Sequence, residues 1–339
     1  MKSILSCLKW SIRLCLSASL FLFGLGPAQR ASAQNGDELE VVQLRPNFYM
    51  IAGAGGNIGI QTGPDGLVLV NTGSQAASSR ILAAIKKLSD QPIRYIIDTS
   101  ADADVVGGNA SLAKAGRSIF ASGTTPLGGE AARDVTGGFG ASILAHENVL
   151  LRMSAPTGKA SSFPLEAWPV ESFDEARRYI YMNHEGIEMF HQPAAHSDGD
   201  VLVFFRASDV VVSGDVLDST RFPVIDIEKG GSIQGEIDAL NHLVELAVRP
   251  IPFVFQEGGT YILPGHGRVF EQSDVVEYRD MVVIVRDVIQ DMIKRGMTLG
   301  QIKEASPAKP FESQYGSKSG PWTTNDFVEA IYKSLMAKK

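Results

Sequence analysis

Two histidines and three aspartates are the side chains of this 339-residue sequence best suited to bind a divalent cation. Asp102 and Asp104 stand two residues apart after an apolar run, and His196, Asp215 and His266 follow at long intervals in short loops that contain glycine. Imidazole nitrogens and carboxylate oxygens bind zinc, manganese and iron in proteins. A cation held in this way lowers the pKa of a coordinated water, to about 7 in good zinc sites. These residues therefore indicate metal-assisted hydrolysis as a candidate chemistry.

The segment Tyr95–Asn109 sets two of these aspartates in a particular frame. An apolar strand leads into a polar loop, and a Gly-Gly pair then begins a helix. This arrangement resembles the His-x-His-x-Asp-His motif of the metallo-β-lactamase superfamily. Only Asp104 matches the motif, because its first histidine position holds Ser100, its second Asp102 and its third Val105.

Four further segments resemble motifs of the same superfamily, in the same order along the chain. They are similar to the hairpin before its first helix, its His-Thr-x-Gly-Asp loop, its metal-bridging Gly-Asp pair and its final histidine loop. The segments are Asn57–Gly73, Ala195–Asp200, Ser213–Asp215 and Pro264–Gly267. The resemblance spans about Leu39 to Gly267. It implies an α/β fold, the αββα sandwich of two facing mixed β-sheets with helices outside, and two zinc ions at the sandwich edge.

The resemblance also implies which side chains would surround each metal position. Carried over residue by residue, one position has Ser100, Asp102 and His196, the other has Asp104, Val105 and His266, and Asp215 stands between them.

The residue types at these positions do not support a full two-zinc centre. Val105 cannot bind a metal, and the neutral hydroxyl of Ser100 is a weak ligand. Carboxylate-rich sites also favour harder ions than zinc. We therefore expect one divalent cation, zinc, manganese or iron, held by some of Asp102, Asp104, His196, Asp215 and His266. In this hypothesis Asp104 is catalytic: it orients a water and relays its proton. The substrate is a small-molecule ester, thioester or amide, including a lactam.

The alternative hypothesis is a binding protein that has lost its metal site and its activity. Carboxylates that converge without a cation repel one another, so one would stay protonated or turn to backbone N–H donors. Asp104 could cap the helix that begins at the Gly-Gly pair. His196 and His266 could bond only to backbone. A third reading, a sulfur-handling or redox relative, lacks any flavin fingerprint in the sequence.

The first thirty-three residues are typical of a signal peptide. Lys2, Lys9 and Arg13 form a basic start, an apolar run follows, and Ala31–Ala33 offers a small-residue cleavage site. The apolar run is shorter than the ~20 residues of a membrane span. We therefore expect an exported protein, periplasmic or secreted.

Removing this leader has two consequences for the mature chain. Both cysteines, Cys7 and Cys15, lie in it, so no disulfide or thiolate ligand is expected afterwards. The leader also holds four basic residues and no acidic one, so the formal charge changes from −7 to −11. An acidic surface argues against nucleic acid and against an anionic membrane as partners. The expected partner is a small-molecule substrate, and the oligomeric state is left open.

Apolar periodicity and Gly-containing turns predict β-hairpins first and mixed β and α elements later. The predicted strands are Leu39–Leu44, Asn47–Ile51, Asn57–Thr62, Gly66–Val70, Ile93–Asp98, Ser118–Ala121, Tyr179–Met182, Ile187–His191, Val201–Phe205, Val210–Val212 and Tyr261–Leu263. The predicted helices are Ser74–Leu88, Gly108–Ala115, Ile143–Met153, Ile233–Val248, Asp274–Lys294, Leu299–Ala305 and Asn325–Leu335. We expect a signal peptide over 1–33, a metallo-β-lactamase-like domain over 34–272 and a helical C-terminal extension over 273–339.

Two glycine-bearing segments stay undecided at this level. The turn Gly230–Gly231 precedes a helix for which Ser232 is the expected N-cap, and it could form one wall of the cleft. The loop Tyr315–Trp322 could pack over the fold or form a lid.

Overall fold

The computed structural model describes residues 39–118, 140–155, 161–250 and 258–337. These residues belong to one compact unit. The predicted signal peptide over 1–33 lies outside the described residues, as do residues 119–121 of the strand expected at Ser118–Ala121. No helix within the described ranges is long and apolar enough to cross a bilayer.

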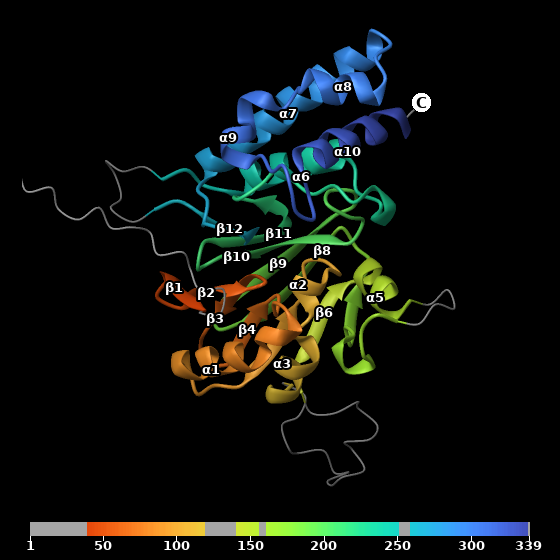
Figure 1. Ribbon diagram of the computed structural model, residues 1–339. Coiled ribbons are helices and arrows are strands. Elements are labelled where there is room, and N and C mark those ends of the chain that lie inside the picture. The colour runs from red at the N-terminus through yellow and green to blue at the C-terminus, as the bar shows by residue number, and fades with distance from the viewer. Residues whose placement is uncertain (1–38, 119–139, 156–160, 251–257, 338–339) are drawn as a thin grey trace, which may run out of the picture. The chain divides into compact units, whose positions relative to one another are not determined.

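The strands of the described residues form two sheets that face each other (Figure 1). The first sheet has the order β1-β2-β3-β4-β5-β6-β7, with antiparallel pairs up to β4 and parallel pairs beyond it. The second has the order β12-β11-β10-β9-β8, in which only β11 and β12 are parallel. The strands are β1 (Glu40–Arg45), β2 (Phe48–Ala54), β3 (Gly56–Gln61), β4 (Leu67–Val70), β5 (Ile93–Ile97), β6 (Ser142–His146), β7 (Glu171–Phe173), β8 (Arg177–Met182), β9 (Glu185–Gln192), β10 (Asp200–Phe205), β11 (Val210–Asp218) and β12 (Tyr261–His266).

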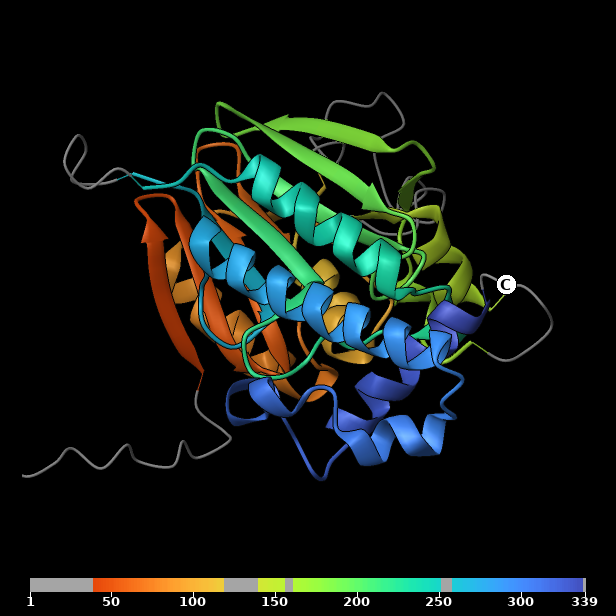
Figure 2. The same cartoon turned by 90° about the horizontal axis from the view of Figure 1, so that it is seen from above.

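Helices cover the outer face of each sheet, which confirms the predicted αββα sandwich with C-terminal helices (Figure 1). The α-helices are α1 (Ser78–Leu88), α2 (Ala103–Val106), α3 (Asn109–Ala115), α5 (Glu147–Ser154), α6 (Ile233–Leu246), α7 (Gln272–Lys294), α8 (Leu299–Ala305), α9 (Glu312–Tyr315) and α10 (Thr324–Ala337). Short 3₁₀ turns are η1 (Gln75–Ala77), η3 (Leu165–Ala167), η4 (Ile227–Lys229) and η5 (Lys309–Phe311). Seen from above, α6 and α7 run side by side across the second sheet (Figure 2).

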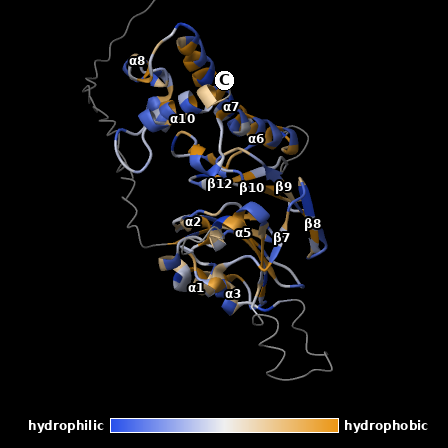
Figure 3. Ribbon diagram, turned by 90° about the vertical axis from the view of Figure 1, so that its right-hand side faces the viewer, coloured by the Kyte–Doolittle hydropathy of each residue, from blue (hydrophilic) through white to orange (hydrophobic). Residues whose placement is uncertain are grey.

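The alternation of side chains along the strands explains the layers. In β10, Val201 and Val203 pack into the cluster between the sheets, whereas Leu202 packs into the cluster under α6 and α7. In β4, Val68 and Val70 face the other sheet, whereas Leu67 and Leu69 face α1 and α3. Successive strand residues point to opposite faces, so apolar runs of this kind are buried on both sides. The covering helices are amphipathic, with hydrophobic and hydrophilic residues interleaved along α6 and α7 (Figure 3).

The predicted helix Ile143–Met153 is wrong over its first four residues. Residues Ser142–His146 form β6, an inner strand of the first sheet, and only Glu147–Ser154 is helical. The spacing of Val149 and Met153, both buried, is the helical signal that extended the prediction too far toward the N-terminus. His146 ends the strand as the N-cap residue of α5, where Nδ1 accepts a hydrogen bond from the N–H of Asn148.

The C-terminal helices share a hydrophobic cluster with the second sheet and α6. Phe327 of α10 stacks on Phe222, the residue that follows Arg221, with ring centroids 4.7 Å apart. The hydroxyl of Tyr278 on α7 donates to the carbonyl of Arg221 at 3.1 Å, and the N–H of Phe222 donates to the carbonyl of Tyr315 at 3.1 Å. These contacts fix the chain that follows β11, which borders the candidate site. The division between a domain over 34–272 and an extension over 273–339 stays a prediction.

A buried carboxylate joins the two sheets. Glu185 of β9 is 3% exposed and accepts a hydrogen bond from the amide of Gln61 on β3. It also accepts from the backbone N–H groups of Ala207 and Ser208, at 2.8 and 2.9 Å, and from the Ser208 hydroxyl at 2.6 Å.

Glu185→Ala should therefore destabilise the protein by about 3 kcal/mol, because several buried donors lose their acceptor at once. Urea unfolding of the variant measures the loss. Glu166→Ala, at an exposed carboxylate, is the matched control and should change the free energy of unfolding little. A loss below about 1 kcal/mol for Glu185→Ala would show that this carboxylate does not hold the sheets together.

Candidate metal centre

The fold brings all five predicted site residues to one cavity of about 190 Å³. Asp102 is the N-cap residue of α2 and Asp104 lies in its first turn, just beyond β5. His196 lies in the loop between β9 and β10, Asp215 lies on β11, and His266 ends β12. The ends of strands from both sheets therefore meet here, as the order of the motifs predicts.

Local backbone contacts fix the loop that follows β5. The side-chain oxygen of Asn71 accepts from the N–H and the hydroxyl of Thr99, at 3.0 and 2.9 Å. Asn71 has a φ of 67°, a left-handed conformation that asparagine adopts more readily than most residues. Gly214 lies against Thr99 so closely that a Cβ would come within 2.3 Å of its Oγ1. This contact holds β11, and with it Asp215, against the loop that carries Ser100 and Asp102.

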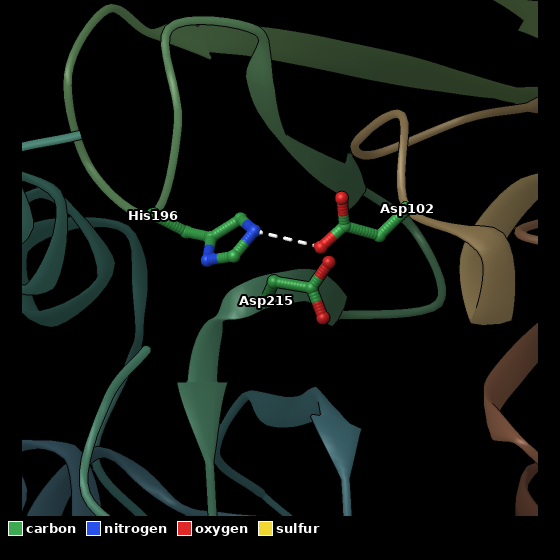
Figure 4. A group of neighbouring side chains, drawn as sticks. All are labelled: Asp102, His196 and Asp215. Atoms are coloured by element: carbon green, nitrogen blue, oxygen red, sulfur yellow. Dashed lines mark hydrogen bonds and ion pairs between the residues drawn. The ribbon is translucent and has the colours of Figure 1, made fainter. Parts of the chain in front are cut away.

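Asp102 and His196 form the central pair of the site (Figure 4). His196 Nε2 lies 2.9 Å from Asp102 Oδ2, and His196 Nδ1 lies 2.8 Å from the carbonyl oxygen of Val224. A carbonyl only accepts, so Nδ1 carries a proton, and Nε2 is the nitrogen that faces Asp102. Metal-binding histidines usually have this arrangement, with the other ring N–H donated to a carbonyl.

The electrostatics of this pair are strongly coupled. Burial by itself would lower the pKa of His196, but the hydrogen bond with Asp102 and the charges of Asp200 and Asp215 raise that pKa well above its usual value. Burial likewise would raise the pKa of Asp102, but His196 and Lys229 hold it well below its usual range. At neutral pH the two groups therefore form an ion pair when no cation lies between them.

Lys229 is the residue at this site that sequence reasoning missed. Its ammonium lies 2.7 Å from Asp102 Oδ1 and 3.0 Å from Asp226 Oδ2. The pKa of Lys229 is raised by these two carboxylates although burial opposes the shift. The sequence points to Lys229 only indirectly, because this residue precedes the Gly230–Gly231 turn, a candidate wall of the cleft. The N-cap role expected for Ser232 in that segment is confirmed, since its side chain accepts from the N–H of Gly235.

Asp215 is held by a residue from one of the altered motif positions. The Ser100 hydroxyl donates to Asp215 Oδ2 at 2.8 Å, so serine supports a carboxylate where the motif has a histidine. Burial raises the pKa of Asp215, and the charges of Asp102 and Asp104 add to the shift.

Asp104 and His266 form a second pair, with Oδ2 and Nε2 3.0 Å apart. The hydrogen bond with His266 lowers the pKa of Asp104, and the pKa of His266 is raised in return despite its burial. Asp104 does not cap the helix that begins at the Gly-Gly pair, because the N-cap residue of α3 is Gly108, and Asp104 lies within α2.

The donor set fits one divalent cation and not two. One ligand atom each from Asp102, His196 and Asp215 lies within 4.8 Å of the others. Metal bonds of 2.0–2.2 Å put two ligands at most about 4.4 Å apart, so a shift of a few tenths of an ångström would close the site. At the second position Val105 is 2% exposed and packs in an apolar cluster, so it offers nothing to a metal. That Asp104 and His266 bind a metal stays a prediction.

Residues at the end of β11 and beyond it complete the cavity. Asp218, Arg221 and Val224 line it on one side, and Pro321 and Trp322 line it on another. The C-terminal loop is therefore a wall of the cavity, which answers the question that the sequence left open. Within the described residues the indole N–H of Trp322 is buried without a hydrogen-bond partner. Arg221 is bound to Asp218 through Nε.

Comparison with solved structures identifies the fold. A metallo-β-lactamase from Pontibacter korlensis matches at a TM-score of 0.50 and 14% identity, over 72% of this chain and 99% of that one. A double mutant of the sec-alkylsulfatase Pisa1 matches at 0.59 and 12% identity, over 88% of this chain. The stereoselective inverting sec-alkylsulfatase Pisa1 from Pseudomonas sp. matches at 0.58 and 12% identity, over 87% of this chain.

These likenesses show that the chain has the metallo-β-lactamase fold. The chain spans about half the length of the alkylsulfatase chains, since the matches cover 50% of each. No protein-family model and no curated protein matches the sequence.

Glu236 lies on α6 and gives a pH-dependence that can be tested. It is 0% exposed, and neither carboxylate oxygen has a hydrogen-bond partner among the described residues. Burial raises its pKa well above the usual value, and Asp200 adds to the shift. Below the unfolded-state pKa of about 4.3 both states hold the proton, and burial carries no ionisation penalty. As pH rises the unfolded state releases the proton first, so stability is lost.

Glu236→Gln should therefore be more stable than the parent at pH 7 and should lose this advantage near pH 4. Chemical unfolding in chelator at both pH values measures the difference. Glu245→Gln, at an exposed position of the same helix, should show no such pH-dependent gain. An equal effect of Glu236→Gln at both pH values would mean that folding does not raise the pKa of Glu236.

Proposed function

We propose that this chain, which has the metallo-β-lactamase fold, is an exported hydrolase that holds one divalent cation between Asp102, His196 and Asp215. Zinc, manganese and iron suit these donors. The substrate is a small-molecule ester, thioester or amide, including a lactam. The observation that carries the proposal is the convergence of the three ligand atoms within 4.8 Å, with His196 oriented through its Nδ1 bond to Val224. The leader over 1–33 supports export to the periplasm or beyond.

A bound cation would supply Lewis acidity and lower the pKa of water at the site. The chain's own residues provide the proton handling. Asp104 is the most exposed of the three site carboxylates, with 39% of its side chain accessible, and its lowered pKa keeps it ionised at neutral pH. Its carboxylate accepts the proton from the attacking water and later returns it to the leaving oxygen, sulfur or nitrogen. His266 orients that carboxylate through the 3.0 Å contact.

A second candidate function is a binding protein without metal or activity. The observation in its favour is that Lys229 and His196 already neutralise Asp102 through contacts of 2.7 and 2.9 Å. Such a protein would still offer the cavity to a small molecule. Metal content and its effect on stability separate the two candidates.

Protein at equilibrium with a dialysis buffer that contains zinc or manganese should hold about one equivalent of bound metal above the level of the buffer, measured by elemental analysis, because three protein ligands suffice for one catalytic ion. Asp215→Asn should lower the stoichiometry well below one, and chelator should lower the melting temperature of the parent but not of the variant. Asp238→Asn, at an exposed position of α6, is the control and should bind like the parent. No bound metal at equilibrium and no effect of chelator would favour the binding protein.

Asp104→Asn should lower the turnover of the metal-loaded protein on the simple ester 4-nitrophenyl acetate by about 100-fold, the lower range for losing a general base. Metal content should stay unchanged, because Asp104 lies outside the group of three ligand atoms. Initial rates at saturating ester give the comparison, and Asp90→Asn, an exposed site, serves as the matched variant. Equal rates for Asp104→Asn and the parent would remove Asp104 from the mechanism.

A further inference from the structure

The positively charged ammonium of Lys229 lies beside Asp102, one of the three candidate metal ligands. Its ammonium is 2.7 Å from Asp102 Oδ1, while the other oxygen of the same carboxylate contacts His196 at 2.9 Å. Asp226 holds the ammonium from the other side at 3.0 Å. Lys229 thus takes one of the two oxygens through which Asp102 could bind a metal.

The backbone holds Lys229 in this place. Its carbonyl accepts from the N–H of Asp198 at 2.9 Å and from the Arg152 guanidinium at 3.1 Å. The N–H of Asp226 donates to the carbonyl of His196 at 2.9 Å. Gly231 follows at a point where a Cβ would come within 2.3 Å of that same carbonyl, so the loop can approach His196 only with glycine there. The position of Lys229 is therefore tied to the loop that carries the ligand histidine.

A fixed ammonium beside a ligand carboxylate affects metal binding in two ways. It repels a divalent cation, with an energy that a partly buried site screens only incompletely. It also stabilises the state without a metal, because it offsets the repulsion among Asp102, Asp104 and Asp215 that an empty site would otherwise carry. Both effects weaken the binding of a divalent cation.

We propose that Lys229 is a built-in competitor for the metal at Asp102, so that the Asp102–His196–Asp215 group binds a divalent cation weakly and reversibly. This inference rests on the proposed function in taking that group as the cation site. Removing the ammonium charge should tighten binding at least about tenfold, since even water-like screening leaves appreciable repulsion at a separation of a few ångströms.

The test is the dissociation constant for Mn²⁺, measured by electron paramagnetic resonance of the free ion on chelator-treated, dialysed full-length protein. The variants are Lys229→Met and Lys229→Gln, which remove the charge in two ways so that one folded variant suffices, and Lys229→Arg, which keeps it. Lys294→Met, at an exposed position of α7, is the matched control. Melting temperatures in chelator provide a second readout: the neutral variants should melt lower than the parent, because Asp102 keeps only His196 of its two charged partners.

Each outcome decides a different claim. Tighter Mn²⁺ binding by the neutral variants, with parent-like binding by Lys229→Arg, supports the inference. Equal dissociation constants for the parent and the neutral variants overturn it and leave the proposed function intact. Binding by the neutral variants alone supports the competitor role and contradicts a metal-dependent parent enzyme. No Mn²⁺ binding by any variant contradicts both.

Discussion

The negative charges of several carboxylates in a partly buried cavity must be compensated by positive or hydrogen-bonding partners, and the arrangement of the site follows from this requirement. Asp102, Asp104 and Asp215 line one cavity, and burial raises the pKa of any carboxylate that lacks a compensating partner. Each has a partner from a distant part of the chain. Asp102 pairs with His196 and Lys229, Asp104 pairs with His266, and Asp215 receives the hydroxyl of Ser100. A divalent cation would provide the same compensation at the centre of the group.

The sandwich supplies the places from which these partners come. Residues after the carboxyl end of β5, on β11 and at the carboxyl end of β12 line one cavity, so both sheets contribute to it. Gly214 and Gly231 permit backbone approaches that a side chain would block. The C-terminal helices fix the segment after β11 through Tyr278 and Tyr315, and their connecting loop closes the cavity with Trp322. The helices beyond β12 therefore help to shape the site as well as to cover the second sheet.

Much of the fold could be predicted because local patterns determine it. The apolar run Val201–Phe205 predicts a buried strand, and the apolar stripe along one face of Ile233–Leu246 predicts a helix. The structure has both elements close to the predicted bounds. The segment Ile143–Met153 was predicted wrongly as one helix. An inner strand and a helix, both with apolar residues, follow each other there without a turn between them. Strand pairing, which no periodicity reveals, decides that boundary.

The site was predictable only in part, for a different reason. The motif order pointed to Asp102, Asp104, His196, Asp215 and His266, and the structure places all five around one cavity. Lys229 and Trp322 had no such signal, because their roles depend on where loops far along the chain come to rest. Lys229 lies 127 residues from Asp102. In our proposal, its charge weakens the binding of a metal at the substituted motif.

The most direct measurement is an anomalous difference map from a crystal grown with MnCl₂, recorded where manganese scatters anomalously. The account predicts one peak within coordination distance, about 2.2 Å, of Asp102, His196 Nε2 and Asp215, and no second peak beside Val105. A map without a peak at that position, with the Lys229 ammonium still bound to Asp102, would contradict it.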